Sequence, residues 1–120
     1  MSKFTQAAKK CLSGSPVLEG RTKLELDTVM SRYPEGVTVD EFDILAGEKG
    51  PYPVFHIKDT DNYFNGGALA MKVVEGWVAM YEGDVSKASE ELKKEGGCTF
   101  KLTHGRTRKG NPIIVYSVVE

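Results

Sequence analysis

The most concentrated positive charge in the sequence is the run Arg-Thr-Arg-Lys at residues 106–109, between two segments of β-strand character. Guanidinium and ammonium groups bind phosphate oxygens, so a cationic turn of this kind suits the backbone of a nucleic acid. Lys49 lies in an earlier glycine-rich turn and Lys101 on the expected outward side of a strand, so both could extend the cationic surface. The alternative interpretation is that these turns are charged only because they are exposed to water.

Aromatic residues could add a second kind of contact, because a base stacked on an aromatic ring contributes about 1–3 kcal/mol. Neighbours along a strand point to opposite faces, so burial of Phe55 would turn His56 outward, and Lys58 with it. By the same rule, burial of Phe64 leaves Tyr63 exposed. The general tendency of aromatic residues favours the core for any single ring, because these residues mainly supply buried apolar area. The candidate nucleic-acid contacts are Lys49, Tyr52, His56, Lys58, Tyr63, Lys101, Arg106, Arg108 and Lys109.

Signals for catalysis or metal binding are weak. His56 and His104 are the only histidines, and neither a His-x3-His nor a Cys-x2-Cys spacing occurs. Cys98 and His104 would stand about 20 Å apart along a strand, too far for a nucleophile and its base. The acid-rich segments 40–43 and 59–61 could hold a metal ion, although such segments are more often caps and solvated loops. We expect no enzyme, no cofactor and no metal, and an acidic-site enzyme remains a third hypothesis that stabilisation by a divalent metal would favour.

The composition indicates one globular domain: the chain has 120 residues, of which 40% are hydrophobic and 28% charged. No apolar run approaches the roughly 18 residues of a membrane-spanning helix, and the N-terminus has no secretory leader pattern. Two cysteines far apart in sequence form no disulfide framework, so we expect a cytoplasmic protein. The net charge is −1, but the signs are segregated: residues 98–120 carry four basic residues and one acidic residue, whereas residues 24–97 carry seven basic and fifteen acidic residues.

The hydrophobic spacing predicts helices first and strands afterwards. Apolar residues at helical intervals indicate helices at 3–12 and from Thr22 to Tyr33, with Glu25 placed as a capping box requires. Alternation over 37–44 changes parity near Asp40 and Glu41, which indicates a β-bulge. The remaining expected elements are strands at 54–58, 63–65, 98–103 and 113–119, a helix at 68–81 and a helical continuation capped by Asp84.

Past residue 36 the expected order is three strands, a helix and two strands, which is the order of the OB-fold, a five-stranded barrel. We therefore expect an α+β protein with one or two N-terminal helices: an arm over 1–20, helical or mobile, and an OB-like domain over 21–120. The ligand loops of such a barrel would be 47–52 and 105–112, where the cations lie. The same order also permits an open antiparallel sheet with the helix packed on one face.

Several short patterns in residues 33–120 resemble small phage- and mobile-element-encoded proteins, some of them described as single-stranded DNA-binding proteins with OB-like folds. The patterns are Tyr33-Pro34-Glu35-Gly36-Val37-Thr38, Phe42-Asp43-Ile44, Tyr52-Pro53-Val54-Phe55, Tyr63-Phe64-Asn65-Gly66-Gly67 and Lys109-Gly110-Asn111. The resemblance implies a role in DNA replication or recombination, with the basic hairpin and exposed aromatics as ligand contacts. It also implies oligomeric binding, although the sequence shows no oligomer interface and no acidic tail beyond Glu120.

The leading hypothesis is sequence-tolerant binding of single-stranded nucleic acid, DNA in preference to RNA, without a membrane partner and with homo-oligomerisation left open. The alternative is a protein–protein interaction or regulatory module that binds no nucleic acid. The segregated charges and the acidic middle of the chain suit that alternative equally well.

Overall fold

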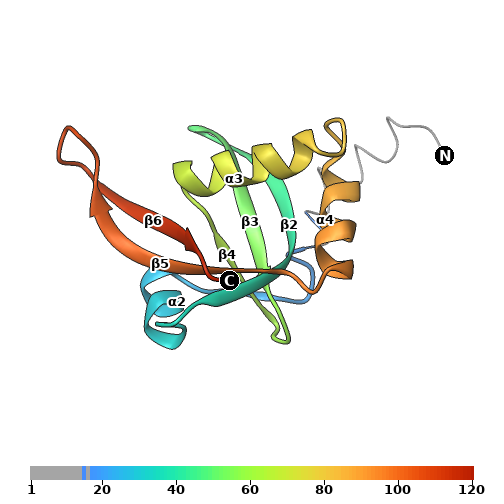
Figure 1. The fold of residues 1–120 in the computed structure, drawn as a ribbon, viewed down its shortest axis with the longest axis horizontal. Coiled ribbons are helices and arrows are strands. Elements are labelled where there is room, and N and C mark those ends of the chain that lie inside the picture. Colours follow the sequence, from blue (N-terminus) through green and yellow to red (C-terminus); the bar gives the residue numbers. More distant parts are fainter. Residues whose placement is uncertain (1–14, 16) are drawn as a thin grey trace.

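A computed structural model describes Ser15 and residues 17–120, which form one curled sheet with three helices packed against it (Figure 1). The strands are arranged in the order β1-β4-β3-β2-β5-β6, with β1 parallel to β4 and all other neighbours antiparallel. No helix in this part of the chain is long and apolar enough to cross a bilayer. The elements are β1 (Thr22–Lys23), α2 (Leu26–Arg32), β2 (Val37–Gly47), β3 (Gly50–Ile57), β4 (Asn62–Asn65), α3 (Ala68–Ala79), α4 (Val85–Lys94), β5 (Cys98–Arg106) and β6 (Pro112–Val118).

The expected α+β class is confirmed, and every strand predicted beyond residue 36 is present. The sheet is open, because no ladder of hydrogen bonds joins β6 to β4 in the described residues. A closed five-stranded barrel is therefore not formed. The sheet is also mixed and not purely antiparallel, because the short strand β1 adds in parallel at the β4 edge.

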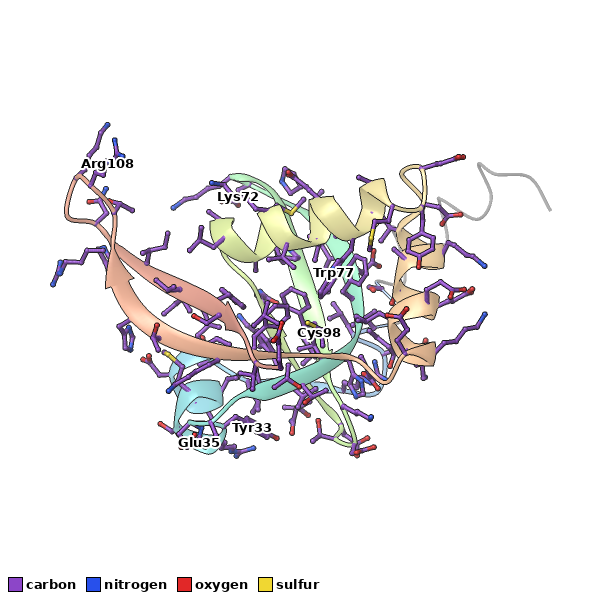
Figure 2. The ribbon with its side chains drawn as sticks, in the orientation of Figure 1. Tyr33, Glu35, Lys72, Trp77, Cys98 and Arg108 are labelled. Atoms are coloured by element: carbon purple, nitrogen blue, oxygen red, sulfur yellow. The ribbon has the colours of Figure 1, made fainter. Side chains whose placement is uncertain are left out.

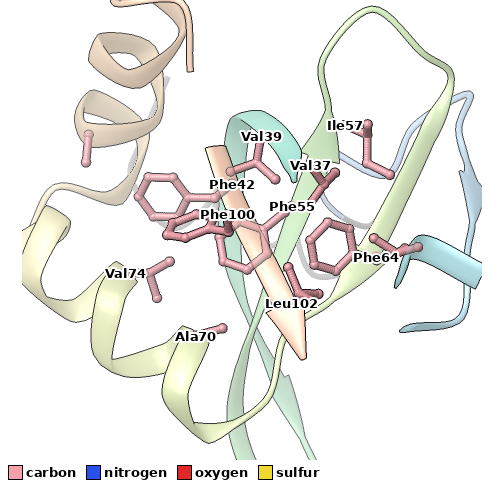
Figure 3. Close-up of a cluster of buried hydrophobic side chains, with 12 residues drawn as sticks. Val37, Val39, Phe42, Phe55, Ile57, Phe64, Ala70, Val74, Phe100 and Leu102 are labelled. Carbon is pink, nitrogen blue, oxygen red and sulfur yellow. The ribbon is translucent and has the colours of Figure 1, made fainter. Parts of the chain in front are cut away.

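Aromatic side chains fill the concave side of the sheet. Phe42, Phe55, Phe64 and Phe100 are each no more than 1% exposed (Figure 3). Trp77 of α3 adds its ring at 5.4 Å from that of Phe42, measured between ring centroids. The predicted burial of Phe55 and Phe64 is thus confirmed, and it holds the two strands that carry them against α3.

The predicted bulge in β2 is confirmed by a register shift between Val39 and Glu41 in its pairing with β3. The backbone N–H of Phe42, just past the shift, donates to the Ser89 hydroxyl of α4 at 3.0 Å. A bulge disturbs the alternation of side chains, and here it leaves Asp40 and Glu41, which are consecutive, both close to the His56 ring.

Ser89→Ala is expected to lower the free energy of unfolding by about 1–2 kcal/mol, because the N–H of the buried Phe42 would lose its partner. Chemical denaturation monitored by Trp77 fluorescence measures this loss. Ser86→Ala, on an exposed position of the same helix, is the matched control and should change stability by less than about 0.5 kcal/mol. Equal effects of the two substitutions would show that Ser89 does not support the bulge.

The predicted helix starts have three different outcomes. The helix expected at 3–12 lies outside the described residues. The capping box at Thr22 is wrong: α2 begins at Leu26, and the Thr22 N–H donates to Asp61 O at 2.9 Å in the pairing with β4. Strand pairing with a distant segment thus replaces the local cap. The cap at Asp84 is confirmed, because its carboxylate accepts from the Lys87 N–H.

Candidate nucleic-acid interface

A groove of about 970 Å³ lies between the β2–β3 hairpin tip and the first half of α3. The β5–β6 hairpin also contacts α3, through β6. In Figure 1 both hairpin tips lie on the same side of the molecule as α3. The two turns that the sequence selected are therefore not at opposite ends of the protein. The groove is lined by residues 47–53 and 66–68 together with Met71, Lys72 and Glu75.

The β2–β3 tip brings Lys49 and Tyr52 together at this groove. Gly50 has a φ of 113°, a conformation that glycine adopts without strain, and it allows the chain to reverse within two residues. A Cβ at Gly47 would lie 3.0 Å from the Tyr52 ring, so the ring packs over that glycine. Tyr52 is thereby held at the rim of the groove while remaining partly exposed.

The β5–β6 hairpin projects from the body of the protein and carries the cationic turn at its tip. Arg106 donates from Nη1 to Gly110 O at 3.0 Å, and the Thr107 N–H donates to Asn111 O, so the turn is closed by its own backbone. Arg108 is exposed at the end of this arm (Figure 2). In the described part of the chain, none of the lysine and arginine side chains in this hairpin forms an ion pair.

Lys72 is a groove residue that the sequence interpretation missed. It lies on the first half of α3, beside the β2–β3 tip, and is labelled in Figure 2. The signal that could have found it is its position five residues after Gly67, where the strand-to-helix turn meets the expected ligand loop. Gly66 itself is needed for packing, because a Cβ there would lie 2.5 Å from the Ala70 Cβ.

Tyr116 connects β6 to the start of α3. Its ring packs edge-on against Phe100, with centroids 5.8 Å apart, so it belongs to the core and is not an exposed stacking ring. Burial raises the pKa of the Tyr116 phenol, and the nearby Gly67 N–H opposes this effect more weakly. The hydroxyl oxygen is buried without a geometrically sound hydrogen bond to any described residue.

Three of the predicted exposed contacts lie away from the groove. Lys58 stands at the opposite end of β3 from Lys49, and its ammonium donates to Gly96 O at 3.0 Å. Tyr63 is half-buried on β4, beside Lys23 of β1. Lys101 is exposed on the outward side of β5, as the alternation predicted, but nearer the base of the arm. The predicted contacts that gather around the two tips are Lys49, Tyr52, Arg106, Arg108 and Lys109.

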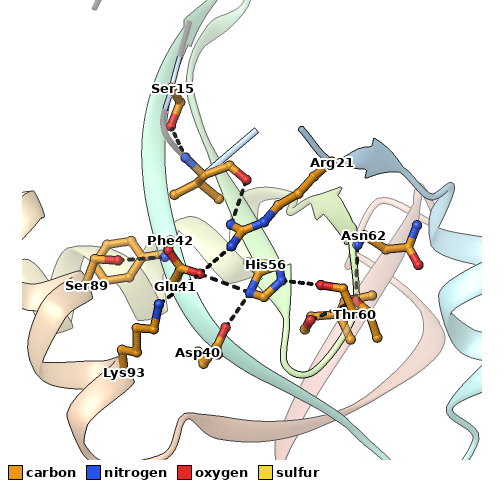
Figure 4. Close-up of polar contacts among 12 residues, drawn as sticks. Ser15, Arg21, Asp40, Glu41, Phe42, His56, Thr60, Asn62, Ser89 and Lys93 are labelled. Atoms are coloured by element: carbon orange, nitrogen blue, oxygen red, sulfur yellow. Dashed lines mark hydrogen bonds and ion pairs between the residues drawn. The ribbon is translucent and has the colours of Figure 1, made fainter. Parts of the chain in front are cut away.

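His56 is not exposed, and its expected place on a ligand-binding face is corrected by the structure. The ring does point opposite to Phe55, but only 6% of the residue is exposed. Arg21 and Glu41 form an ion pair of 2.8 Å above it (Figure 4). Ser15 donates to Asp43 at 2.6 Å on the same side of the sheet. The chain's own N-terminal segment thus occupies the face that was expected to receive the ligand.

The buried ring lies among acceptors on both sides. Nδ1 is 2.6 Å from Asp40 Oδ1 and 3.1 Å from Glu41 Oε2, while Nε2 is 2.7 Å from Thr60 O (Figure 4). The Thr60 carbonyl can only accept, so Nε2 carries a proton and donates to it, while Nδ1 faces the two carboxylates.

This cluster also has the composition of a metal site, because ligand atoms of Asp40, Glu41 and His56 lie within 4.8 Å of one another. The same Glu41 oxygen, however, is paired with Arg21 at 2.8 Å and with Lys93 at 3.8 Å. These cations already balance the carboxylates, and a divalent ion would add charge beside them. We interpret the cluster as a buried ion-pair network that joins β2, β3 and α4.

The other pair considered for chemistry, Cys98 and His104, is not brought together, because both lie on the single extended strand β5. Burial raises the pKa of the Cys98 thiol, which keeps it protonated and poorly nucleophilic. The His104 ring lies instead near Asp27 of α2, at 3.7 Å.

Comparison of the chain with known protein families, curated proteins and solved structures found no match. These comparisons therefore do not test the resemblance to phage-encoded single-stranded DNA-binding proteins.

Proposed function

We propose that the protein binds single-stranded nucleic acid, DNA in the first instance, across the surface formed by the two hairpin tips and the first half of α3. The observation that carries the proposal is the charge of the β5–β6 arm. Residues 98–119 contain four basic residues and no acidic one, and these cations are exposed and without ion pairs among the described residues. Lys49 and Lys72 add two further exposed or groove-lining cations.

The strand order is compatible with this use of the hairpins. The run β4-β3-β2-β5-β6 is the neighbour order expected for the five strands of an OB-like fold, left open at the β4/β6 junction. In that arrangement the β2–β3 and β5–β6 tips correspond to the two loops that flank the ligand. The proposed path of the ligand then crosses the start of α3, because segment 17–21 covers the outer side of His56.

The balance of charges sets the expected strength of binding. Each phosphate neutralised by a cation contributes about 0.7 to the dependence of log affinity on log salt for a single strand. The Tyr52 ring can add about 1–3 kcal/mol by stacking on one base. Glu48 and Glu75 line the same groove and oppose a polyanion. We therefore expect moderate affinity that falls steeply with salt.

A fluorescence-anisotropy titration with labelled oligo-dT at low and moderate salt tests the proposal directly. Binding at micromolar protein in low salt, weakened as salt is added, is the expected result. RNA and duplex DNA of the same length show whether single-stranded DNA is preferred. No binding in low salt, or an affinity that salt does not change, would contradict the proposal.

Combined Arg108→Ala and Lys109→Ala replacement is expected to weaken oligo-dT binding and to reduce the salt slope by about 1.4, the share of two phosphate contacts. Both side chains are exposed at the arm tip, so the fold should be unaffected. The matched control is Lys87→Ala with Lys94→Ala on α4, which removes the same charge away from the hairpin tips. An equal loss in both variants would mean that net charge, and not the arm, determines binding.

A further inference from the structure

Strand β6 forms a free edge of the sheet. It pairs with β5 along one side only, and at its end the Val119 N–H donates to Thr99 O at 2.9 Å. Backbone groups alternate in direction along a strand, so those of Ile114, Tyr116 and Val118 point away from β5. None of these groups has a hydrogen-bond partner among the residues that the structure describes.

The two edges of the sheet differ in their protection against further pairing. The β1 edge is two residues long and carries Lys23, which lies 3.8 Å from Glu25. The β6 edge is seven residues long, contains no charged residue and pairs with β5 in an unbroken register. At its end Val118 is 64% and Val119 40% exposed. A long, regular, uncharged edge with exposed apolar side chains is suited to pairing with another strand.

We propose that β6 pairs antiparallel with β6 of a second copy of this chain, which makes a two-fold symmetric dimer with one continuous sheet. Val115 is the middle residue of the strand, so a pairing centred on it uses the whole of β6. Ile114 then lies opposite the partner's Tyr116, and the two exchange both of their backbone hydrogen bonds. Pro112 has no N–H to lose at the edge, and its carbonyl accepts from the partner's Val118.

We infer a second copy as the partner because β6 and the residues on either side of it are complementary to the same residues of another chain. Continuing the same register places Gly110 opposite the partner's Glu120, so this carboxylate lies beside the cationic turn of Arg108 and Lys109. On the outer face Val115 meets the partner's Val115, and paired β-branched side chains stabilise neighbouring strands. The dimer is formed by the strand edge and not by the groove, although the contact of the partner's Glu120 and the proposed nucleic-acid site share Arg108 and Lys109.

The mass of the full chain in solution, measured by light scattering over a concentration series, is the first test. The wild type is expected to approach twice the monomer mass, and Val118→Lys, which puts a charge on the free edge, is expected to remain monomeric. Thr103→Lys adds the same charge on β5, away from the edge, and should leave the dimer intact. A monomeric wild type at every concentration, or a dimeric Val118→Lys variant, overturns the proposal.

Cross-linking tests the register. In a background with Cys11→Ser and Cys98→Ser, Val115→Cys should form an intermolecular disulfide on oxidation, because facing residues at this position have Cα atoms about 4.5 Å apart. Ile113→Cys is the control, since its neighbour would be the partner's Ser117. A disulfide at Ile113 but not at Val115 would contradict the pairing. Oligo-dT titration of the Val118→Lys monomer separates the two proposals, because it is expected to bind while failing to dimerise.

Discussion

Replacement of Phe55 by alanine is expected to lower the free energy of unfolding by about 3–5 kcal/mol. Phe55 is fully buried, and its ring lies 5.4 Å from Phe64, 6.4 Å from Phe100 and 6.4 Å from Trp77, measured between centroids. These neighbours come from β4, β5 and α3. A cavity at this point therefore removes contacts among the strands and contacts between the sheet and α3 together. Urea denaturation measures the loss.

Phe55→Leu is the matched control for this experiment. It keeps most of the buried volume and should cost roughly half as much as the alanine variant, because the cost follows the size of the cavity that remains. The folded Phe55→Ala protein should still bind oligo-dT, since Phe55 has no exposed surface that could contact a ligand. A stability loss below about 1 kcal/mol for the alanine variant would show that the aromatic cluster is not the centre of the core.

The elements beyond residue 36 could be predicted because they follow local regularities of the sequence. The alternation of apolar residues in β2 changes parity at Asp40, and the structure places a bulge at that point. Asp84 was predicted to cap α4 from its position before an amphipathic segment, and it does so. The openness of the sheet could not be predicted in this way, because whether β6 meets β4 depends on the curvature of all the strands together.

The N-terminal region shows where local rules are overridden. Thr22 and Glu25 have the spacing of a capping box, but the two side-chain hydrogen bonds of such a box serve only one helix end. Pairing with β4 gives this segment two backbone hydrogen bonds to a distant part of the chain. The Thr22 N–H donates to Asp61 O and the Leu24 N–H donates to Tyr63 O. The helix consequently begins four residues after Thr22, at Leu26. No property of residues 22–25 alone indicates that a free strand edge is nearby.

The candidate site was predictable only in part, for the same physical reason. Turn cations such as Lys49 and Arg108 were found because turns and charges are both visible in sequence. Lys72 was missed because a single lysine on a helix has no local pattern that distinguishes it. Of the rings predicted to contact the ligand, His56 is buried in the ion-pair network and Tyr63 is half-buried on β4 away from the groove, which leaves Tyr52 as the ring at the groove. Binding by this surface would therefore depend more on phosphate contacts than on base stacking.

Replacement of His56 by alanine is expected to lower the free energy of unfolding by about 3–5 kcal/mol, because it leaves the carboxylates of Asp40 and Glu41 without the ring nitrogen that both contact. Arg21 and Lys93 remain near Glu41, so most of the uncompensated charge falls on Asp40, which is 8% exposed. Removal of Asp40 in the same chain should therefore cost much less than the sum of the two single losses, and a double-mutant cycle measures this coupling.

His104→Ala is the control for this experiment, because it removes the chain's other histidine from an exposed position and should change stability by less than about 0.5 kcal/mol. Zinc separates the ion-pair network from a metal site formed by the same residues. If His56, Asp40 and Glu41 form only a polar network, zinc leaves the melting temperature of the wild type unchanged. A rise of the melting temperature with zinc that His56→Ala abolishes would instead mean that the imidazole ligates the metal through Nδ1, and the cluster would then be a metal-binding site.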